Sequence, residues 1–226
     1  AKYTSAGSFL WARRMGDPED DGGSGVACDS SGNVIVSGDV FGTANLDGNT
    51  TIDQPYESKG AKGAGDGFIT KFNPNGVFLW GKRIGGSSAD NIRSVKTDAS
   101  DNVIIVGYVD GNGNAADLNG DGDFTDPDEA SSNAGVGSDS FVSKFNSSGT
   151  PLWHKRLGRG SNHNDQAMQV DTDASGNIVI TGYTSGTIDL NADGDTADAP
   201  HENTSLGGLM DAWVTSFNSS GTFRWA

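Results

Sequence analysis

The sequence lacks the features that would cross-link the chain or anchor it in a membrane. It has one cysteine, Cys28, in 226 residues, so no disulfide can form within the chain. No apolar stretch approaches the roughly 20 residues that a membrane-spanning helix needs. Hydrophobic residues make up only 34% of the chain, and no segment keeps a helical period of 3.6 residues. These absences exclude a disulfide-stabilised domain and argue against a helical fold.

Basic residues are also few. The chain has 15 Lys and Arg against 30 Asp and Glu, which gives a formal net charge of −15. Such a surface repels the phosphates of nucleic acids and of anionic lipids. We therefore expect no nucleic acid partner and no membrane insertion, whereas cations suit this surface.

Catalytic signatures are missing as well. The histidines His154, His163 and His201 occupy unrelated positions, and there is no HExxH motif and no Cys/His cluster. Neither a G-x-S-x-G elbow nor a phosphate-binding glycine loop is present. The sequence therefore predicts no enzyme activity, no catalytic residue and no organic cofactor.

Glycine and a long internal repeat are what the chain has in abundance. Glycine occurs 34 times, which is typical of many short strands joined by tight turns. The near-copies FLWARRMG, FLWGKRIG and PLWHKRLG, with FRWA at the end, recur at intervals of roughly seventy residues. Their tryptophans are Trp11, Trp80, Trp153 and Trp225. This regular placement of aromatic residues favours a folded repeat protein over disorder.

Each repeat predicts two β-hairpins. In VKTDASDNVIIVG, a strand of alternating residues is followed by the turn DASDN and an apolar run, and a second hairpin turns at NSSG. Four antiparallel strands in this order form a blade of a β-propeller. We therefore predict an all-β fold of about three tandem four-stranded antiparallel propeller-type blades. They form either an open array or part of a larger propeller.

The alignment of the repeats also predicts their boundaries. Residues 1–16 form the last strands of a preceding repeat, 17–85 repeat 1, 86–158 repeat 2, and 159–226 repeat 3 with an incomplete last strand. Known propellers close with about four to eight blades. We therefore expect these repeats to belong to a longer tandem array.

One repeat resembles a known family. The segment GSDSFVSKFNSSGTPLWHKRLG, followed by VDTDASGNIVITGYTSG, is similar to the bacterial β-propeller repeat family called SBBP. The resemblance covers nearly the whole chain, apart from long insertions between the second and third strands of each repeat. It implies propeller-type blades in an exported or cell-surface protein. It implies no reaction, because the family has no common catalytic set.

Two of the insertions carry a calcium-loop pattern. The segment DLNGDGDFTDPD resembles EF-hand-like and dockerin-like loops, in which oxygen ligands alternate along the chain and a glycine at position 6 bends it. The predicted ligands of this copy are Asp117, Asn119, Asp121, Asp123, Asp126 and Asp128. Those of the second copy, DLNADGDTAD, are Asp189, Asn191, Asp193, Asp195 and Asp198. We predict Ca²⁺ rather than Mg²⁺, which prefers to keep several waters.

The pattern leaves the closing ligand open in the first copy. Either Asp126 at position 10 or Asp128 at position 12 could complete the shell. Position 12 of the second copy is Pro200, which offers no side-chain oxygen, so we favour the acid at position 10 in both copies. The first repeat keeps only the alternation, at Asn45, Asp47 and Asn49. The sequence does not decide whether calcium binds there.

The repeated tryptophans and the basic pairs beside them complete the pattern. A tryptophan could stack on a sugar, but a periodic tryptophan is more often part of the core between blades. The basic pairs are expected on a solvated strand face, at Arg13–Arg14, Lys82–Arg83 and Lys155–Arg156.

Two functional classes fit these observations. The first is a calcium-stabilised extracellular structural protein, a segment of a cell-surface or filament assembly built by stacking of β repeats. Its partners would be neighbouring repeats or copies of itself. The second is a β-propeller module that binds a glycan or a protein. We predict secretion from a bacterial or archaeal cell in either case.

Overall fold

The computed structural model describes residues 1–49, 51–52, 54, 57, 65–110, 115–129, 137–158, 163–198, 202 and 209–226. The fold is all-β, and no helix occurs in these ranges. In particular, the described part of the chain contains no helix long and apolar enough to cross a membrane. All pairs of named strands are antiparallel.

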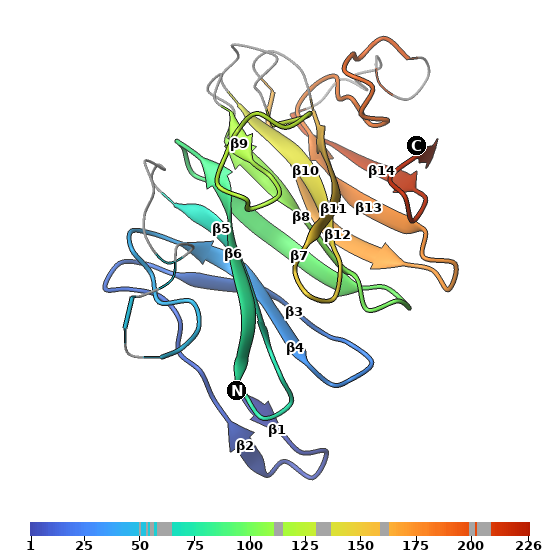
Figure 1. The fold of residues 1–226 in the computed structure, drawn as a ribbon. Coiled ribbons are helices and arrows are strands. Elements are labelled where there is room, and N and C mark those ends of the chain that lie inside the picture. Colours follow the sequence, from blue (N-terminus) through green and yellow to red (C-terminus); the bar gives the residue numbers. More distant parts are fainter. Residues whose placement is uncertain are drawn as a thin grey trace.

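Three sheets form propeller-type blades, each with its strands in chain order (Figure 1). Blade 1 consists of β3 (Gly22–Cys28), β4 (Val34–Val40), β5 (Asp66–Phe72) and β6 (Phe78–Gly86). Blade 2 consists of β7 (Asn91–Thr97), β8 (Val103–Asp110), β10 (Ser138–Phe145) and β11 (Pro151–Leu157). Blade 3 consists of β12 (Asp165–Thr172), β13 (Ile178–Thr184), β14 (Asp211–Phe217) and β15 (Phe223–Trp225). A separate hairpin joins β1 (Lys2–Tyr3) to β2 (Phe9–Trp11).

Short side-chain-capped turns close the hairpins at one end of each blade. Between β3 and β4, Asp29 Oδ1 accepts hydrogen bonds from the backbone N–H groups of Ser31 at 3.0 Å and Asn33 at 2.9 Å. Asp98 and Asp173 do the same in blades 2 and 3. Asparagines cap the turn between the third and fourth strands in each blade, at Asn73, Asn146 and Asn218. These are the local bonds that Asp and Asn make in turns.

The hydrophobic core lies between the blades. Successive residues of a strand point to opposite faces, so Val103 and Ile105 of β8 pack toward blade 1 while Ile104 and Val106 pack toward blade 3. This two-sided burial explains why the second strand of each repeat is a continuous apolar run. The first strands β3, β7 and β12 lie next to one another where the three blades converge (Figure 1).

The repeated tryptophans link consecutive units, as predicted. Each indole donates its Nε1–H to a backbone carbonyl of the next blade, from Trp11 to Pro74 at 2.8 Å, Trp80 to Ser147 at 3.2 Å and Trp153 to Ser219 at 3.1 Å. The rings also cover glycines of those turns, at Gly76, Gly149 and Gly221. The fourth tryptophan, Trp225, is 44% exposed.

The prediction of a solvated face for the basic pairs is wrong for Arg83 and Arg156, whereas Arg14, the second member of the first pair, is exposed. Arg83 is 6% exposed, and its Nε lies 2.6 Å from Asp66 Oδ2. Arg156 is 1% exposed, and its Nη1 lies 3.7 Å from Asp139 Oδ2. In both cases an acid on the neighbouring strand compensates the charge of the buried guanidinium. Without that partner, a buried guanidinium would be strongly destabilising.

Candidate cation-binding loops

Three acidic loops join the second and third strands of the blades. We define loop 1 as residues 45–57, loop 2 as 117–129 and loop 3 as 189–202. Because the strands run in meander order, all three loops lie at the end of the blades opposite the capped turns (Figure 1). The repeat therefore places the predicted cation ligands in one region of the molecule.

The first residue of each loop is hydrogen-bonded to the end of the preceding unit. In loop 2, Ala116 and Asp117 form the two-residue strand β9 (Ala116–Asp117), which pairs with Gly85 and Gly86 of β6. In loop 1, Asn45 and Gly16 exchange backbone hydrogen bonds of 3.1 and 2.8 Å. In loop 3, Gly158 N–H donates to Asp189 O at 3.4 Å. Each loop thus bridges two consecutive units.

The alternating ligand residues turn their side chains back onto the loop. In loop 2, Asp117 Oδ2 accepts from Gly122 N–H at 2.9 Å, and Asn119 Oδ1 accepts from Asp121 N–H at 2.8 Å. Asp121 Oδ1 in turn accepts from Asp123 N–H at 3.0 Å. Loop 3 repeats these bonds through Asp189, Asn191 and Asp193. The loops of these two blades therefore share one conformation.

Left-handed backbone at positions 4 and 6 makes this conformation possible. The φ angles are +68° at Gly120 and +96° at Gly122 in loop 2, and +59° at Ala192 and +103° at Gly194 in loop 3. Glycine adopts such angles without strain, whereas alanine does so rarely. The glycine at position 6, which the sequence singled out, has the required role in both loops.

The buried acid that closes each loop is a glutamate that the sequence interpretation missed. Glu129 is 0% exposed, and its Oε1 accepts from Leu118 N–H at 2.8 Å. Glu202 is 2% exposed, and its Oε1 accepts from Leu190 N–H at 2.9 Å. Glu57 of loop 1 is 0% exposed and accepts from Leu46 N–H at 2.9 Å.

A signal for these glutamates was present in the sequence. The chain has only four glutamates, and three of them end the acidic loops. The EF-hand template places the closing acid at position 12, whereas Glu57 and Glu129 lie at position 13 and Glu202 at position 14 of their loops. A search at position 12 alone could not find them.

The two aspartates that the sequence offered as closing ligands lie nearer the surface. Asp126 is half-buried, and its Oδ2 accepts from Asn119 Nδ2 at 2.6 Å. Its counterpart Asp198 is exposed and accepts from Asn191 Nδ2 at 2.8 Å. Asp128 is half-buried, with a φ of +71°. Pro200, which marked position 12 of loop 3, lies outside the described residues.

Because the closing glutamates are buried, a negative charge on them is unfavourable unless it is compensated. Burial, together with the nearby carboxylates of Asp117, Asp121 and Asp126, raises the pKa of Glu129 to about 7. Burial likewise raises the pKa of Glu202, with Asp189 and Asp193 adding to the shift. In both glutamates Oε2 is buried and has no hydrogen-bond partner among the residues that the structure describes. A proton or a bound cation would remove this cost.

One side-chain group in the described ranges brings three possible ligand atoms of Asp, Glu, His or Cys close together. The group consists of Asp126, Glu129 and His154, whose ligand atoms all lie within 4.8 Å of one another. Of the predicted calcium ligands, it includes only Asp126. His154 and Glu129 were not among the residues that the sequence predicted.

Comparison with known proteins supports the repeat fold. No family model matches the chain. The chain is similar to the uncharacterized WD repeat-containing protein L264 of Acanthamoeba polyphaga mimivirus, at 29% identity over 233 residues. The alignment covers 96% of this chain but only 16% of that protein. Together with the three meander sheets, this relationship supports a β-propeller-type repeat protein, while the resemblance to the bacterial SBBP family stays a prediction.

Proposed function

We propose that this chain is a β-propeller-type interaction module whose acidic loops bind calcium. The observation that carries the calcium assignment is the pair of buried glutamates, Glu129 and Glu202. Each has one oxygen without a hydrogen-bond partner among the described residues, and each lies beside several carboxylates. Ca²⁺ takes six to eight oxygen ligands at about 2.3–2.6 Å and often accepts a closing glutamate. The ligand sets are those predicted from sequence, with Glu129 and Glu202 added.

In this proposal calcium acts between the blades. The first ligand residue of each loop is hydrogen-bonded to the unit before it, through β9 in the case of loop 2. Lys82 of β6 also reaches this loop, donating from Nζ to Gly120 O at 3.0 Å. An ion that fixes the loop therefore also fixes the contact between blade 1 and blade 2.

The size of the effect suggests where such sites would be useful. A site with a Kd of about 10 μM in about 1 mM calcium adds roughly 2.7 kcal/mol to stability. A domain has only about 5–15 kcal/mol in total. Calcium is this abundant outside cells, so the proposal includes an extracellular or cell-surface location.

The surface we assign to a partner is the groove formed by the first strands. Residues 24–26 of β3, 93–96 of β7 and 169–171 of β12 line a groove of about 390 Å³. It mixes charges with apolar area, since Lys96 Nζ lies 2.8 Å from Asp171 Oδ1 and Val26 is 69% exposed. Such a mixed surface suits a protein or peptide. A glycan is less favoured, because Trp11, Trp80 and Trp153 cover glycines instead of offering open rings.

Stacking into a structural assembly is the second candidate, and the repeated tryptophan contacts between consecutive units favour it. Light scattering coupled to size-exclusion chromatography, with calcium and with EGTA, separates the two. An interaction module keeps the mass of one chain, whereas a filament or sheet former grows in mass. Fibres in electron micrographs would overturn the first proposal in favour of the second.

Calcium itself is tested by titration calorimetry and limited proteolysis. We expect calcium to bind and to slow cleavage within loops 2 and 3, and EGTA to reverse the protection. Magnesium at the same concentration serves as the control and should protect less. Equal cleavage rates with calcium and with EGTA would overturn the calcium assignment.

A further inference from the structure

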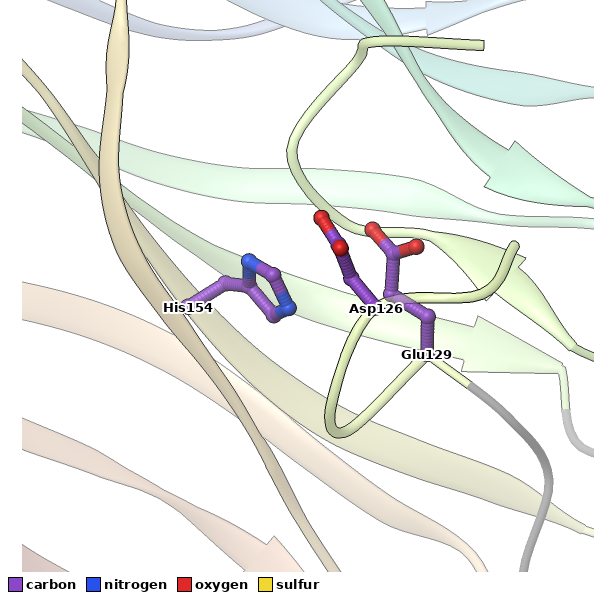
Figure 2. A group of neighbouring side chains, drawn as sticks. All are labelled: Asp126, Glu129 and His154. Atoms are coloured by element: carbon purple, nitrogen blue, oxygen red, sulfur yellow. The ribbon is translucent and has the colours of Figure 1, made fainter. Parts of the chain in front are cut away.

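A group of side chains with both nitrogen and oxygen ligand atoms lies beside loop 2. His154 projects from β11 toward the loop, and Figure 2 shows its ring beside the carboxylates of Asp126 and Glu129. The three ligand atoms lie within 4.8 Å of one another. Glu129 is fully buried, and its Oε2 has no hydrogen-bond partner in the described part of the chain. Asp126 and His154 are half-buried, which leaves the group open to solvent on one side.

We propose that Asp126, Glu129 and His154 bind a divalent transition metal of the zinc class. Imidazole nitrogen suits Zn²⁺ and its neighbours in the first transition row, whereas Ca²⁺ takes oxygen ligands. Three protein ligands, with water in the remaining position, form a common zinc shell, and bonds of about 2.0–2.2 Å would draw the three groups together. The site shares Asp126 and Glu129 with the calcium proposal for loop 2, but it goes beyond that proposal because it adds His154 and requires only that these three side chains converge.

The loop itself holds the imidazole in place. His154 Nε2 lies 2.6 Å from the carbonyl oxygen of Pro127, which sits between the two acidic ligands in the sequence. Contacts of this kind orient histidine ligands at metal sites. The imidazole therefore already lies beside the two carboxylates before a metal binds.

Among the three blades, only blade 2 has a histidine directly after the repeated tryptophan. The residue after the repeated tryptophan is His154 in this blade, but Gly81 in blade 1 and Ala226 in blade 3. Loop 3 keeps the two acids, Asp198 and Glu202, and its histidine, His201, comes directly before Glu202 in the sequence and lies outside the described residues.

The test uses Co²⁺ as a spectroscopic probe and Zn²⁺ as its competitor. We expect the full chain, freed of metal, to bind one equivalent of Co²⁺ with the visible absorption of a low-coordinate ion, and Zn²⁺ to displace it. The variant His154→Gly, which installs the residue of blade 1, should lose this absorption and bind Zn²⁺ at least about tenfold more weakly. His163→Gly is the matched control and should bind as the parent does.

Two further measurements keep the outcome unambiguous. The exposed thiol of Cys28 is removed by Cys28→Thr, the residue type of the other two repeats, so that thiolate binding cannot imitate the site. The calcium-induced rise in Tm is recorded for every variant and should survive His154→Gly. Absence of Co²⁺ absorption in the parent, or equal Zn²⁺ affinity of parent and His154→Gly, would overturn the zinc site. Loss of the calcium response alone would overturn only the calcium proposal.

Discussion

Glu129 and Glu202 are the residues on which the shape of the acidic loops depends most. Each uses one carboxylate oxygen to accept a backbone N–H near the start of its loop, so the side chain ties the two ends of the loop together. The second oxygen is buried and requires a positive charge or a proton. A structural hydrogen bond and a cation ligand are therefore combined in one side chain.

Replacing the charge but keeping the hydrogen bond separates these roles. In Glu129→Gln the amide oxygen can still accept from Leu118, but the anionic ligand is gone. We expect the metal-free variant to be at least as stable as the parent at pH 7.5, and its calcium response to fall by one site, about 2.7 kcal/mol at a hundredfold excess over Kd. For a chain of this size this corresponds to roughly 5–10 °C in Tm.

Thermal unfolding with calcium and with EGTA measures this effect. Variants of two other glutamates serve as comparisons. Glu202→Gln should show a similar loss in loop 3. The exposed Glu19 lies outside the loops, so Glu19→Gln should respond to calcium as the parent does. A full calcium response in Glu129→Gln would show that loop 2 does not use this carboxylate.

Asp90 is a second buried acid, with a structural role. It is 4% exposed and accepts hydrogen bonds from the backbone N–H groups of Gly86 and Asp110. Burial, together with the carboxylates of Asp66 and Asp110, raises the pKa of Asp90 to about 7. Because the pKa in the folded protein lies above the ordinary aspartate value of 3.8, protonation of Asp90 favours folding.

Asp90 should therefore make the protein less stable as the pH rises. Its stabilising contribution is complete below about pH 4 and is lost as the pH passes through about 7. Urea unfolding between pH 5 and pH 8 should show this slope, and Asp90→Asn should flatten it. Asp21, its exposed counterpart in repeat 1, provides the control Asp21→Asn. A slope unchanged in Asp90→Asn would contradict the assignment.

At the scale of elements, the contact between a tryptophan and a turn glycine holds consecutive blades together. A Cβ at Gly149 would lie 2.7 Å from Trp80 Cδ2, and the φ angle there is +85°. We expect Gly149→Ala to destabilise the protein both through the left-handed backbone and through displacement of the indole. A glycine that has a positive φ but no contact with an indole allows these two contributions to be measured separately.

Gly176 is that glycine, with a φ of +75° and only an ordinary 3.5 Å contact to Ser219 Cβ. We expect Gly149→Ala to lose about 1–3 kcal/mol more than Gly176→Ala, because only the former overpacks a blade interface. Chemical denaturation followed by tryptophan fluorescence measures the free energy of unfolding of both variants. Equal losses would show that the indole can move aside without cost.

The elements were largely predictable because each strand pattern occurs several times. The turns at Asp29, Asp98 and Asp173 use local hydrogen bonds, which sequence reveals. In contrast, β9 exists only because loop 2 meets the edge of blade 1, and no local pattern encodes such a pairing. Arg83 was assigned to solvent because its acidic partner, Asp66, lies on another strand. The predicted alternating ligands lie together in loops 2 and 3, but the closing glutamates were missed because they lie beyond position 12 of the EF-hand template.

At the scale of the whole molecule, the loops connect units that would otherwise meet only through apolar faces. In solenoids and other repeat arrays, stability is approximately a sum of repeat terms and interface terms, so a stronger interface makes unfolding more cooperative. Because loops 2 and 3 each contact the preceding blade through Asp117 and Asp189, calcium should strengthen both interfaces at once. We expect calorimetry to show one sharp transition in calcium and a broader, lower one in EGTA. The variant Asp189→Asn, which weakens only loop 3, should split the transition in calcium by releasing blade 3 first, whereas Asp171→Asn on the groove should not. A transition of the same width with calcium and with EGTA would mean that any bound ion orders only its own loop.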